Sequence, residues 1–525
     1  MLVNPLGLLA LFSATLAIPP PPPPQPCKPL QTHPPRARIQ NGTLQGLHLP
    51  RFDQDLFLGV PFAQPPLHDL RLRRPVSLNE SWRGIKRAVE RSDSCPGYGG
   101  FREGLRMGEG FTAGGSTDQR YNTSYLIATS TSISKPIIAV SINYRVAAWG
   151  FLASREVVDA GETNIGLFDQ RLALRWIREN IGAFGGDPDK VVIAGESAGA
   201  YSVGYHLVGF DGEHRGLFRG AILQSGGALG PALEDGSDLE TSYQPMYDNI
   251  TATVGCGDAH DSLSCLRHVP YTTLHCAFSA FIMTPILDGD FVTQLPSTSF
   301  AQDRVANVAI LAGSNTDEGT ATFFGPRGTL YTDADVRWFL SDLPGRRQLD
   351  NDTRFAEHGN GAQYKRGAAI VGDLAFHAGR RATTAYFASR AGRRRKPNGV
   401  LELISTSAPV YATHYAEVTF VFNVDPAVSV DATNWIGPDP GYHALAGEMV
   451  RAWVGFVHDL DPNGDCRGGF SNSSGCDQGQ LPYWPGYASG GENMVFRVDV
   501  SYVERDTWRA EQLAYWTGLW GWLKT

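Results

Sequence analysis

The spacing of apolar residues along the chain follows two patterns, one typical of strands and the other typical of helices. Short apolar runs rich in β-branched residues have the pattern of strands that are buried on both faces. These runs are residues 136–146, 191–195, 220–226 and 307–315. Between the first two runs, a segment that includes Leu174, Ile177, Ile181 and Phe184 places these side chains on one face of a helix. Strands that alternate with helices predict an α/β fold with a largely parallel sheet.

The run at 191–195 ends in an unusual turn sequence, Gly195-Glu196-Ser197-Ala198-Gly199, which precedes a helix of small residues. Gly-x-Ser-x-Gly between a strand and a helix is the pattern of a nucleophile elbow. The serine backbone is strained there, and the glycines avoid collisions across the tight turn. The amide of Ala198 would lie at a helix N-terminus, where it could donate to a developing oxyanion. The alternative interpretation is a plain tight turn.

A nucleophilic serine needs a base and an acid that orients the base. In α/β-hydrolases the chain order is serine, acid, histidine. Asp317 and Glu318 follow the strand-like run at 307–315, where such an acid is expected. Three downstream histidines are candidates for the base, and the pattern of residues does not choose among them. They are His414, which precedes a strand-like run, His443 and His458.

Composition and charge narrow the function. The chain has 525 residues, of which 42% are hydrophobic and 11% aromatic, enough for a large core. A net charge of −8 without a concentrated basic region argues against a nucleic-acid partner. No internal repeat and no linker divides the chain after Pro34. We therefore predict one domain, residues 37–525.

The N-terminus has the pattern of an export signal. An apolar stretch, Leu6–Leu16, ends at a small-residue site around Ala17, which predicts a signal peptide over residues 1–17. Residues 18–36 form a proline-rich spacer. No later stretch is apolar enough for a transmembrane helix, so we predict a secreted, extracellular glycoprotein. Glycosylation sequons begin at Asn41, Asn79, Asn122, Asn249, Asn351 and Asn472.

Seven cysteines fit an oxidising compartment, but the odd number leaves at least one without an internal partner. Cys256 and Cys265 enclose a short loop and could form a disulfide, as could Cys466 and Cys476. The cysteines without an evident partner are Cys27, Cys95 and Cys276.

Several stretches together resemble the type-B carboxylesterase/lipase family, which includes the cholinesterases and secreted fungal lipases. They are "FLGVPFAQPP", "NIGLFDQRLALRWIRENIGAFGGDPDKV", "GESAGAYSVGYHL" and "AILQSGG". The resemblance extends from about Arg38 to the C-terminal "YVERDTWRAEQ" and implies the α/β-hydrolase fold. It implies that Ser197 is the nucleophile, Glu318 the acid with Asp317 as its neighbour, and His414 the base. It also pairs Cys256 with Cys265.

One region departs from the family pattern. The family's further oxyanion donors lie in a glycine run, and the match here is "MGEGFTAGGS", in which Gly110 aligns but Glu109 replaces a glycine. A carboxylate there would oppose an oxyanion. No apolar strand precedes it between Gly97 and Lys135, and the partner that the family provides for Cys95 is absent. The resemblance implies that several dozen residues are missing between Glu109 and Gly110. Our hypothesis is a mis-spliced or mis-predicted coding sequence, in preference to an evolved deletion.

The sequence thus predicts a serine carboxylic ester hydrolase that acts through an acyl-enzyme on Ser197, with Glu318 and His414 completing the triad. Ala198 and Gly110 would receive the oxyanion. The expected substrate is a small-molecule or lipid ester, and no metal or organic cofactor is expected. The alternatives are a non-catalytic binding protein on the same fold and an inactive truncated product. The sequence leaves open the acyl and alcohol specificity, lipase or esterase behaviour, and the oligomeric state.

Overall fold

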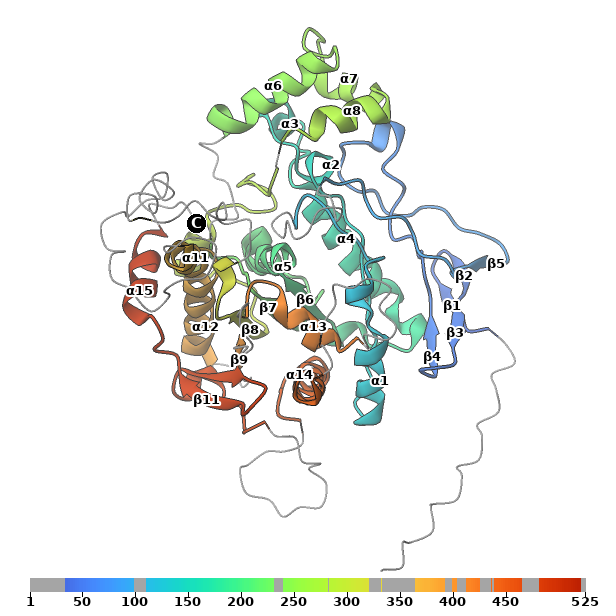
Figure 1. The fold of residues 1–525 in the computed structure, drawn as a ribbon. Helices are drawn as coiled ribbons and strands as arrows, with labels where there is room; N and C mark the ends of the chain where they lie inside the picture. The colour runs from blue at the N-terminus through green and yellow to red at the C-terminus, as the bar shows by residue number, and fades with distance from the viewer. Residues whose placement is uncertain are drawn as a thin grey trace, which may run out of the picture. The chain divides into compact units, whose positions relative to one another are not determined.

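The computed structural model describes most of the chain after residue 33. The described residues are 34–98, 110–230, 239–281, 283–320, 332, 364–391, 399–403, 412–424, 436, 439–464 and 481–520. All of them except Pro34 belong to one compact unit, Pro35–Thr525 (Figure 1). The expected signal peptide, most of the spacer, Glu109 and three cysteines lie outside the described residues. These cysteines are Cys27, Cys466 and Cys476.

A six-stranded sheet in the order β11-β10-β9-β8-β7-β6 lies at the centre of this unit. β6 to β10 run parallel to their neighbours, and β11 runs antiparallel to β10. The runs expected at 191–195, 220–226 and 307–315 form β6, β7 and β8. The six strands are β6 (Val192–Glu196), β7 (Gly220–Gln224), β8 (Ala309–Asn315), β9 (Gly399–Leu403), β10 (Glu492–Phe496) and β11 (Tyr502–Arg505).

The remaining strands precede this sheet in the chain and pair in two small sheets. They are β1 (Arg36–Ile39), β2 (Gly42–Gln45), β3 (Leu47–Leu49), β4 (Gln54–Leu56) and β5 (Ile85–Arg87). The described α-helices begin with α1 (Ser124–Ser132), α2 (Ala148–Phe151), α3 (Arg155–Asp159), α4 (Ile165–Asn180), α5 (Ala198–Val208), α6 (Gln244–Thr253) and α7 (Ser262–His268). They continue with α8 (Tyr271–Phe278), α9 (Pro296–Ala301), α11 (Tyr364–Gly372), α12 (Ala378–Ala391), α13 (Ala416–Phe422), α14 (Pro440–Asp459) and α15 (Ala510–Gly518).

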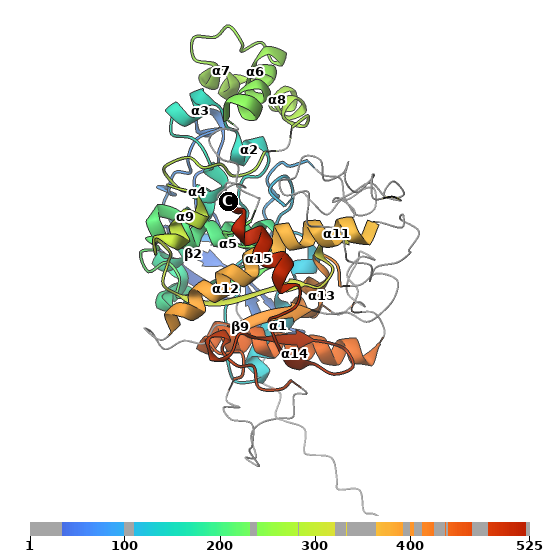
Figure 2. The ribbon, with the colours of Figure 1, turned by 90° about the vertical axis from the view of Figure 1, so that its left-hand side faces the viewer.

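Helices cover both faces of the central sheet, because alternate residues of its buried strands point in opposite directions. Ala221 and Leu223 of β7 pack in one core with side chains of α4, α5 and α12. Ile222 between them packs in the other core, with α13 and α14. Both figures show α13 beside α14, and Figure 2 shows α15 against α12. The sheet is therefore enclosed on both faces, as expected for parallel strands.

Two expected strands are absent from the structure. Residues 136–146 form no strand, and β6 ends the sheet with only β7 beside it among the described residues. A strand needs a neighbour to satisfy its backbone groups, and here none lies on that side. The strand-like run after His414 is instead the helix α13, because Val418 and Val421, three residues apart, face the same helix side and are both buried.

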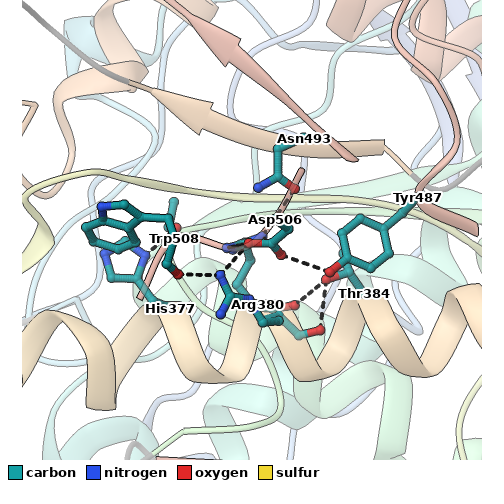
Figure 3. A network of polar contacts seen from close by, with 9 residues as sticks. His377, Arg380, Thr384, Tyr487, Asn493, Asp506 and Trp508 are labelled. Atoms are coloured by element: carbon teal, nitrogen blue, oxygen red, sulfur yellow. Dashed lines mark hydrogen bonds and ion pairs between the residues drawn. The ribbon is translucent and has the colours of Figure 1, made fainter. Parts of the chain in front are cut away.

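The C-terminal segment is held to α12 by a buried ionic network (Figure 3). Arg380 donates two hydrogen bonds to the carboxylate of Asp506, at 2.8 and 3.0 Å, and Arg381 donates a third at 2.5 Å. The hydroxyl of Tyr487 donates to the same carboxylate at 2.9 Å. Asp506 directly follows β11, so the network fixes the far edge of the sheet. Within the described ranges, no helix is long and apolar enough to cross a membrane.

Candidate active site

The turn at Ser197 has the strained geometry expected of a nucleophile elbow. Ser197 has φ 54° and ψ −122°, between the end of β6 and the start of α5. A Cβ on Gly195 would lie 2.2 Å from the backbone carbon of Gly199, so only glycine fits there. A Cβ on Gly199 would meet no atom within 4 Å. The collision that the sequence predicts therefore applies to the first glycine and not to the second.

The structure brings Ser197, His414 and Glu318 into one hydrogen-bonded series. The Oγ of Ser197 lies 2.7 Å from Nε2 of His414, and Nδ1 of His414 lies 2.6 Å from Oε2 of Glu318. The other oxygen of Glu318 accepts a hydrogen bond from the backbone N–H of Asn315 at 2.7 Å. His414 and Glu318 are buried, with exposed fractions of 3% and 0%. Their positions follow from the ends of β6 and β8 and from the start of α13.

The other candidate residues from the sequence do not join this hydrogen-bonded series. His443 is exposed on α14, and Nδ1 of His458 bonds to Asp459 at 2.7 Å. Neither histidine makes a described contact with Ser197 or Glu318. Asp317 donates its backbone N–H to Ala412 O at 2.9 Å and so fixes the segment that carries His414.

Three carboxyl groups surround His414. Oε1 of Glu196 lies 3.4 Å from Nε2 of His414, and the charges of Glu318 and Glu417 also act on the imidazole. Burial alone lowers the pKa of His414, but the negative charges of Glu196, Glu318 and Glu417 outweigh it and raise the pKa above its usual value. Burial raises the pKa of Glu196 well above its usual value, although the charge of His414 acts in the opposite direction.

Glu417 is held by two polar residues that the sequence analysis did not single out. Gln224, at the end of β7, donates its amide to one oxygen of Glu417 at 3.1 Å, and Asn315, at the end of β8, donates to the other. Burial raises the pKa of Glu417. The signal that could have found them is a polar residue at the carboxyl end of each apolar strand, where sites of parallel sheets gather.

The two expected oxyanion donors are neighbours. Ala198 begins α5, and Gly110 lies so close to it that a Cβ on Gly110 would be 2.5 Å from the Cβ of Ala198. Aromatic rings pack on His414 and on its neighbour Tyr415. Phe376 packs on the ring of His414 with centroids 4.6 Å apart, and Tyr121 packs on Tyr415 at 6.1 Å. Ser197, His414, Gly110 and Tyr121 all line one large cavity of about 1670 Å³.

The described cysteines fall into one pair and two single residues. Cys256 and Cys265 form a disulfide across the expected short loop. Cys95 is half-buried and Cys276 is exposed, and neither is in a disulfide. Burial raises the pKa of the Cys95 thiol to about 11, with a further contribution from Asp169. The expected loop between Cys466 and Cys476 lies outside the described residues.

Comparisons with known proteins place the chain in a family. The model of the carboxylesterase family matches residues 33–104 and 107–337. Lipase 4 of Diutina rugosa is 31% identical, with 90% of this chain and 94% of that protein covered. Secreted lipase 1 of Botryotinia fuckeliana (strain B05.10) is 30% identical, with 88% and 89% covered. Acetylcholinesterase of Gallus gallus is 34% identical over 51% of this chain and 40% of that protein.

A solved structure shows the same fold. The crystal structure of Aspergillus niger EstA superposes with a TM-score of 0.78 at 24% identity, and covers 94% of this chain and 99% of that one. The chain therefore belongs to the carboxylesterase family, with the α/β-hydrolase fold, and its class is that of the carboxylic ester hydrolases.

The family match has a break, and the alignment with Lipase 4 contains gaps in this chain. The family match is interrupted at residues 105 and 106, close to the junction between Glu109 and Gly110. The alignment with Lipase 4 runs over 565 positions, more than the 525 residues of the whole chain, so this chain has gaps opposite that relative.

Proposed function

We propose that this chain is a secreted serine ester hydrolase that forms an acyl-enzyme on Ser197. The observation that carries the proposal is the hydrogen-bonded series from Ser197 through His414 to Glu318. A strained elbow presents the hydroxyl, a buried imidazole accepts its proton, and a buried carboxylate orients the imidazole. These are the three roles that nucleophilic serine catalysis requires.

In the acylation step, Oγ of Ser197 attacks the carbonyl carbon of the ester while its proton moves to Nε2 of His414. The carbonyl oxygen becomes an oxyanion, which the N–H of Ala198 at the N-terminus of α5 stabilises. Glu318 stabilises the imidazolium that forms. Collapse of the intermediate breaks the bond to the alcohol oxygen, which leaves with the proton from His414.

In the deacylation step, water takes the place of the alcohol. His414 accepts a proton from water, the hydroxide oxygen attacks the acyl carbon, and a second oxyanion forms at the same donors. Collapse releases the carboxylic acid and returns the proton to Oγ of Ser197. The steps require no metal or organic cofactor, because the side chains supply the nucleophile, the base and the electrostatic stabilisation.

The proposed substrates are esters of small molecules or lipids. Ser197 opens on a cavity whose lining includes the aromatic side chains of Tyr121, Tyr415 and Phe422, which suit an acyl group. Names of relatives such as Lipase 4 and Secreted lipase 1 support a lipid or related ester, and the second name supports secretion.

A second candidate function is binding without catalysis, which two observations favour. β6, which carries the elbow, has no strand on its outer side among the described residues, and Glu109 replaces a glycine where an oxyanion donor is expected. A chain that lacks part of this region could keep the fold and lose turnover, as an inactive truncated product would.

A fluorophosphonate probe distinguishes the two functions, because it reacts with an activated serine and releases fluoride. We expect labelling at Ser197, located by peptide mapping, and loss of labelling in the Ser197→Ala and His414→Ala variants. His443→Ala is the matched control and retains labelling. If folded protein shows no label at Ser197, the binding protein is the better description.

A further inference from the structure

Tyr415 directly follows His414 and has a backbone conformation that is rare for its residue type. Its φ is 76° and its ψ is −5°, in the left-handed region, which a residue with a large side chain seldom adopts. Tyr415 also directly precedes α13, and its carbonyl oxygen accepts a hydrogen bond from the N–H of Val418 at 3.3 Å. The backbone at Tyr415 therefore sets how the segment that carries His414 enters α13. A strained residue of this kind persists only where its surroundings hold it.

Two consecutive residues pack on the ring of Tyr415. The guanidinium carbon of Arg120 lies 4.9 Å from the centroid of this ring, which is the distance of a cation–π contact. The ring of Tyr121 meets that of Tyr415 edge to face at 6.1 Å, and also meets the ring of Phe422 at 5.5 Å. Arg120 and Tyr121 belong to the short 3₁₀ helix η2 (Gln119–Tyr121). The helix η2 therefore contacts the residue before α13 and the last residue of α13.

The side chain of Asp118 fixes the position of the Arg120 guanidinium. One carboxylate oxygen of Asp118 accepts hydrogen bonds from the backbone N–H and from Nε of Arg120, at 2.9 and 3.1 Å. The other oxygen accepts from Nε at 3.0 Å and from Nη2 at 2.6 Å. The two side chains are 19% and 20% exposed. A planar guanidinium that a carboxylate binds along one edge has few orientations left, so the cation stays over the ring.

An alternative role for Arg120 is to bind the substrate, because Arg120 and Asp118 line the same cavity as Ser197. An arginine that recognises an anionic substrate presents an edge of its guanidinium to it. Here the carboxylate of Asp118 occupies the edge formed by Nε and Nη2 and balances the charge. The contact that links this pair to the residue beside His414 is the one with the ring of Tyr415. The geometry therefore favours a role in positioning over a role in binding.

We propose that Arg120 is a positioning residue for His414. It packs on the ring of Tyr415, keeps the backbone of Tyr415 in the left-handed conformation, and so keeps Nε2 of His414 at 2.7 Å from Oγ of Ser197. Asp118 in turn holds Arg120. The inference rests on the proposed function, in which His414 is the general base. A displacement of about 1 Å in a reacting group can lower a rate about 100-fold, so loss of the contact has a measurable effect.

Fluorophosphonate labelling of Ser197 measures the position of the base without the need for turnover. We expect Arg120→Leu to lower the labelling rate about 10–100-fold at a pH where the imidazole is neutral. Arg120→Lys keeps a cation on the ring and retains most of the rate, and Asp118→Asn causes a smaller loss than Arg120→Leu. Arg178→Leu, which removes an arginine from an exposed ion pair, is the matched control and leaves the rate unchanged. An Arg120→Leu variant with the rate of the parent chain would overturn the proposal.

A double-variant cycle separates positioning through Tyr415 from a direct effect of charge. Burial raises the pKa of Glu196, and the charge of Arg120 is one of those that act against it, so Arg120 can also reach the triad through its charge. If the effect passes through the ring, Arg120→Leu changes the labelling rate little in a Tyr415→Leu background, because the contact is already lost. Additive effects of the two substitutions would show that Arg120 acts independently of Tyr415, and would overturn the proposal.

The proton between His414 and Glu318 provides a readout that does not depend on reaction with the serine. Nδ1 of His414 lies 2.6 Å from Oε2 of Glu318, and a proton in so short a hydrogen bond has a distinct downfield NMR resonance. We expect this resonance in the parent chain and in Arg120→Lys, and a shifted or broadened one in Arg120→Leu. If Arg120→Leu does not fold, Asp118→Asn provides the same comparison.

The two readouts separate the positioning role from the proposed function. A parent chain that shows the resonance but no labelling contradicts the proposed function, and the comparison of resonances still tests Arg120. A resonance that is unchanged in both Arg120→Leu and Asp118→Asn overturns the positioning role.

Discussion

His414 lies between a serine hydroxyl and three carboxyl groups. The charges of the carboxyl groups determine the pKa of its imidazole. Burial favours the neutral imidazole, whereas Glu196, Glu318 and Glu417 favour the imidazolium, and the carboxyl groups win. A general base must be neutral to accept a proton. If His414 is the base, as proposed, its raised pKa makes catalysis depend on pH in a direction that can be measured.

We expect the rate of fluorophosphonate labelling of Ser197 to fall as the pH is lowered through the raised pKa of His414. The midpoint of this acid limb lies above the usual histidine value of about 6.5. The measurement is the labelling rate of the folded chain from pH 5 to 10, with circular dichroism at each pH as the control. A midpoint at or below about 6.5 would contradict the electrostatic account.

Substitutions of the triad should act as one unit. The test uses an extended form, in which the segment of Diutina rugosa Lipase 4 that corresponds to the gap is inserted between Glu109 and Gly110. In the extended form, Ser197→Ala and His414→Ala each lower kcat for a short-chain p-nitrophenyl ester by about 10⁴–10⁶-fold, and Glu318→Gln lowers it by somewhat less. The double variant loses little more than the worse single variant, because in the proposed mechanism the three side chains act in one step. A tolerated His414→Ala beside an inactivating His443→Ala would contradict the assignment.

At the scale of single residues, the sequence predicts the serine better than its partners. Ser197 is marked by local turn chemistry, which the elbow pattern contains in full. His414, His443 and His458 are equivalent as a pattern, because only the tertiary fold brings His414 to 2.7 Å from Ser197. Gln224 and Asn315 carry no local signal beyond their place at strand ends.

The elbow is the element that depends most on a small residue. Gly195→Ala would place a Cβ 2.2 Å from the Gly199 backbone, so the turn must distort and the protein loses stability, by several kcal/mol if the backbone cannot shift. Gly199→Ala is the matched control. Its Cβ meets open space in the first turn of α5, and alanine favours a helix by up to about 1 kcal/mol. Urea unfolding of both variants measures the difference, and equal losses would contradict it.

The buried ionic network between α12 and the end of β11, which we call the clamp, consists of Arg380, Arg381 and Asp506. Its contribution to stability should depend on pH. Burial alone raises the pKa of Asp506, but Arg380 and Arg381 hold it below its usual value. A carboxyl group with a lowered pKa stabilises the fold above its unfolded pKa, about 3.9, and loses this effect as the pH falls through its folded pKa.

We therefore expect Asp506→Asn to destabilise the protein at pH 7 by about 3–5 kcal/mol, because two buried guanidinium groups lose their counter-charge. The difference from the parent chain narrows as the pH is lowered towards 3. Asp499→Asn, in an exposed pair with Arg497, is the control and leaves the unfolding midpoint unchanged. Equal effects of the two substitutions would contradict the clamp.

The sequence predicted correctly those elements that have a neighbouring strand or helix to pack or pair with in the structure. β6, β7, β8 and α4 occur as their patterns indicate. Residues 136–146 have an equally clear strand pattern, and the structure contains no strand there, because a strand exists only beside a neighbour and β6 and this segment are not adjacent. The prediction of a strand after His414 was wrong for another reason. The apolar residues of this run also fit one face of a helix, and in α13 that face packs on α14.

At the scale of the whole molecule, β6 has no strand on its outer side among the described residues, and we expect this edge to affect both stability and activity. Open edges and exposed apolar residues such as Ile138 and Val140 invite association between chains. The elbow also lies at the end of a strand that pairs on one side only among the described residues, so the proposed oxyanion donors Ala198 and Gly110 have less support there. We expect the chain as it stands to express poorly or to be nearly inactive.

The hydrolysis of a short-chain p-nitrophenyl ester by the chain as it stands and by the extended form tests the account most directly. Loss of one oxyanion donor lowers the rate about 10²–10³-fold. We predict that the extended form has a kcat/KM higher by at least that factor and a higher melting temperature, and that Ser197→Ala removes its activity. Comparable activity and comparable thermal stability of the two forms would show that the chain manages without a further strand, and would contradict the account.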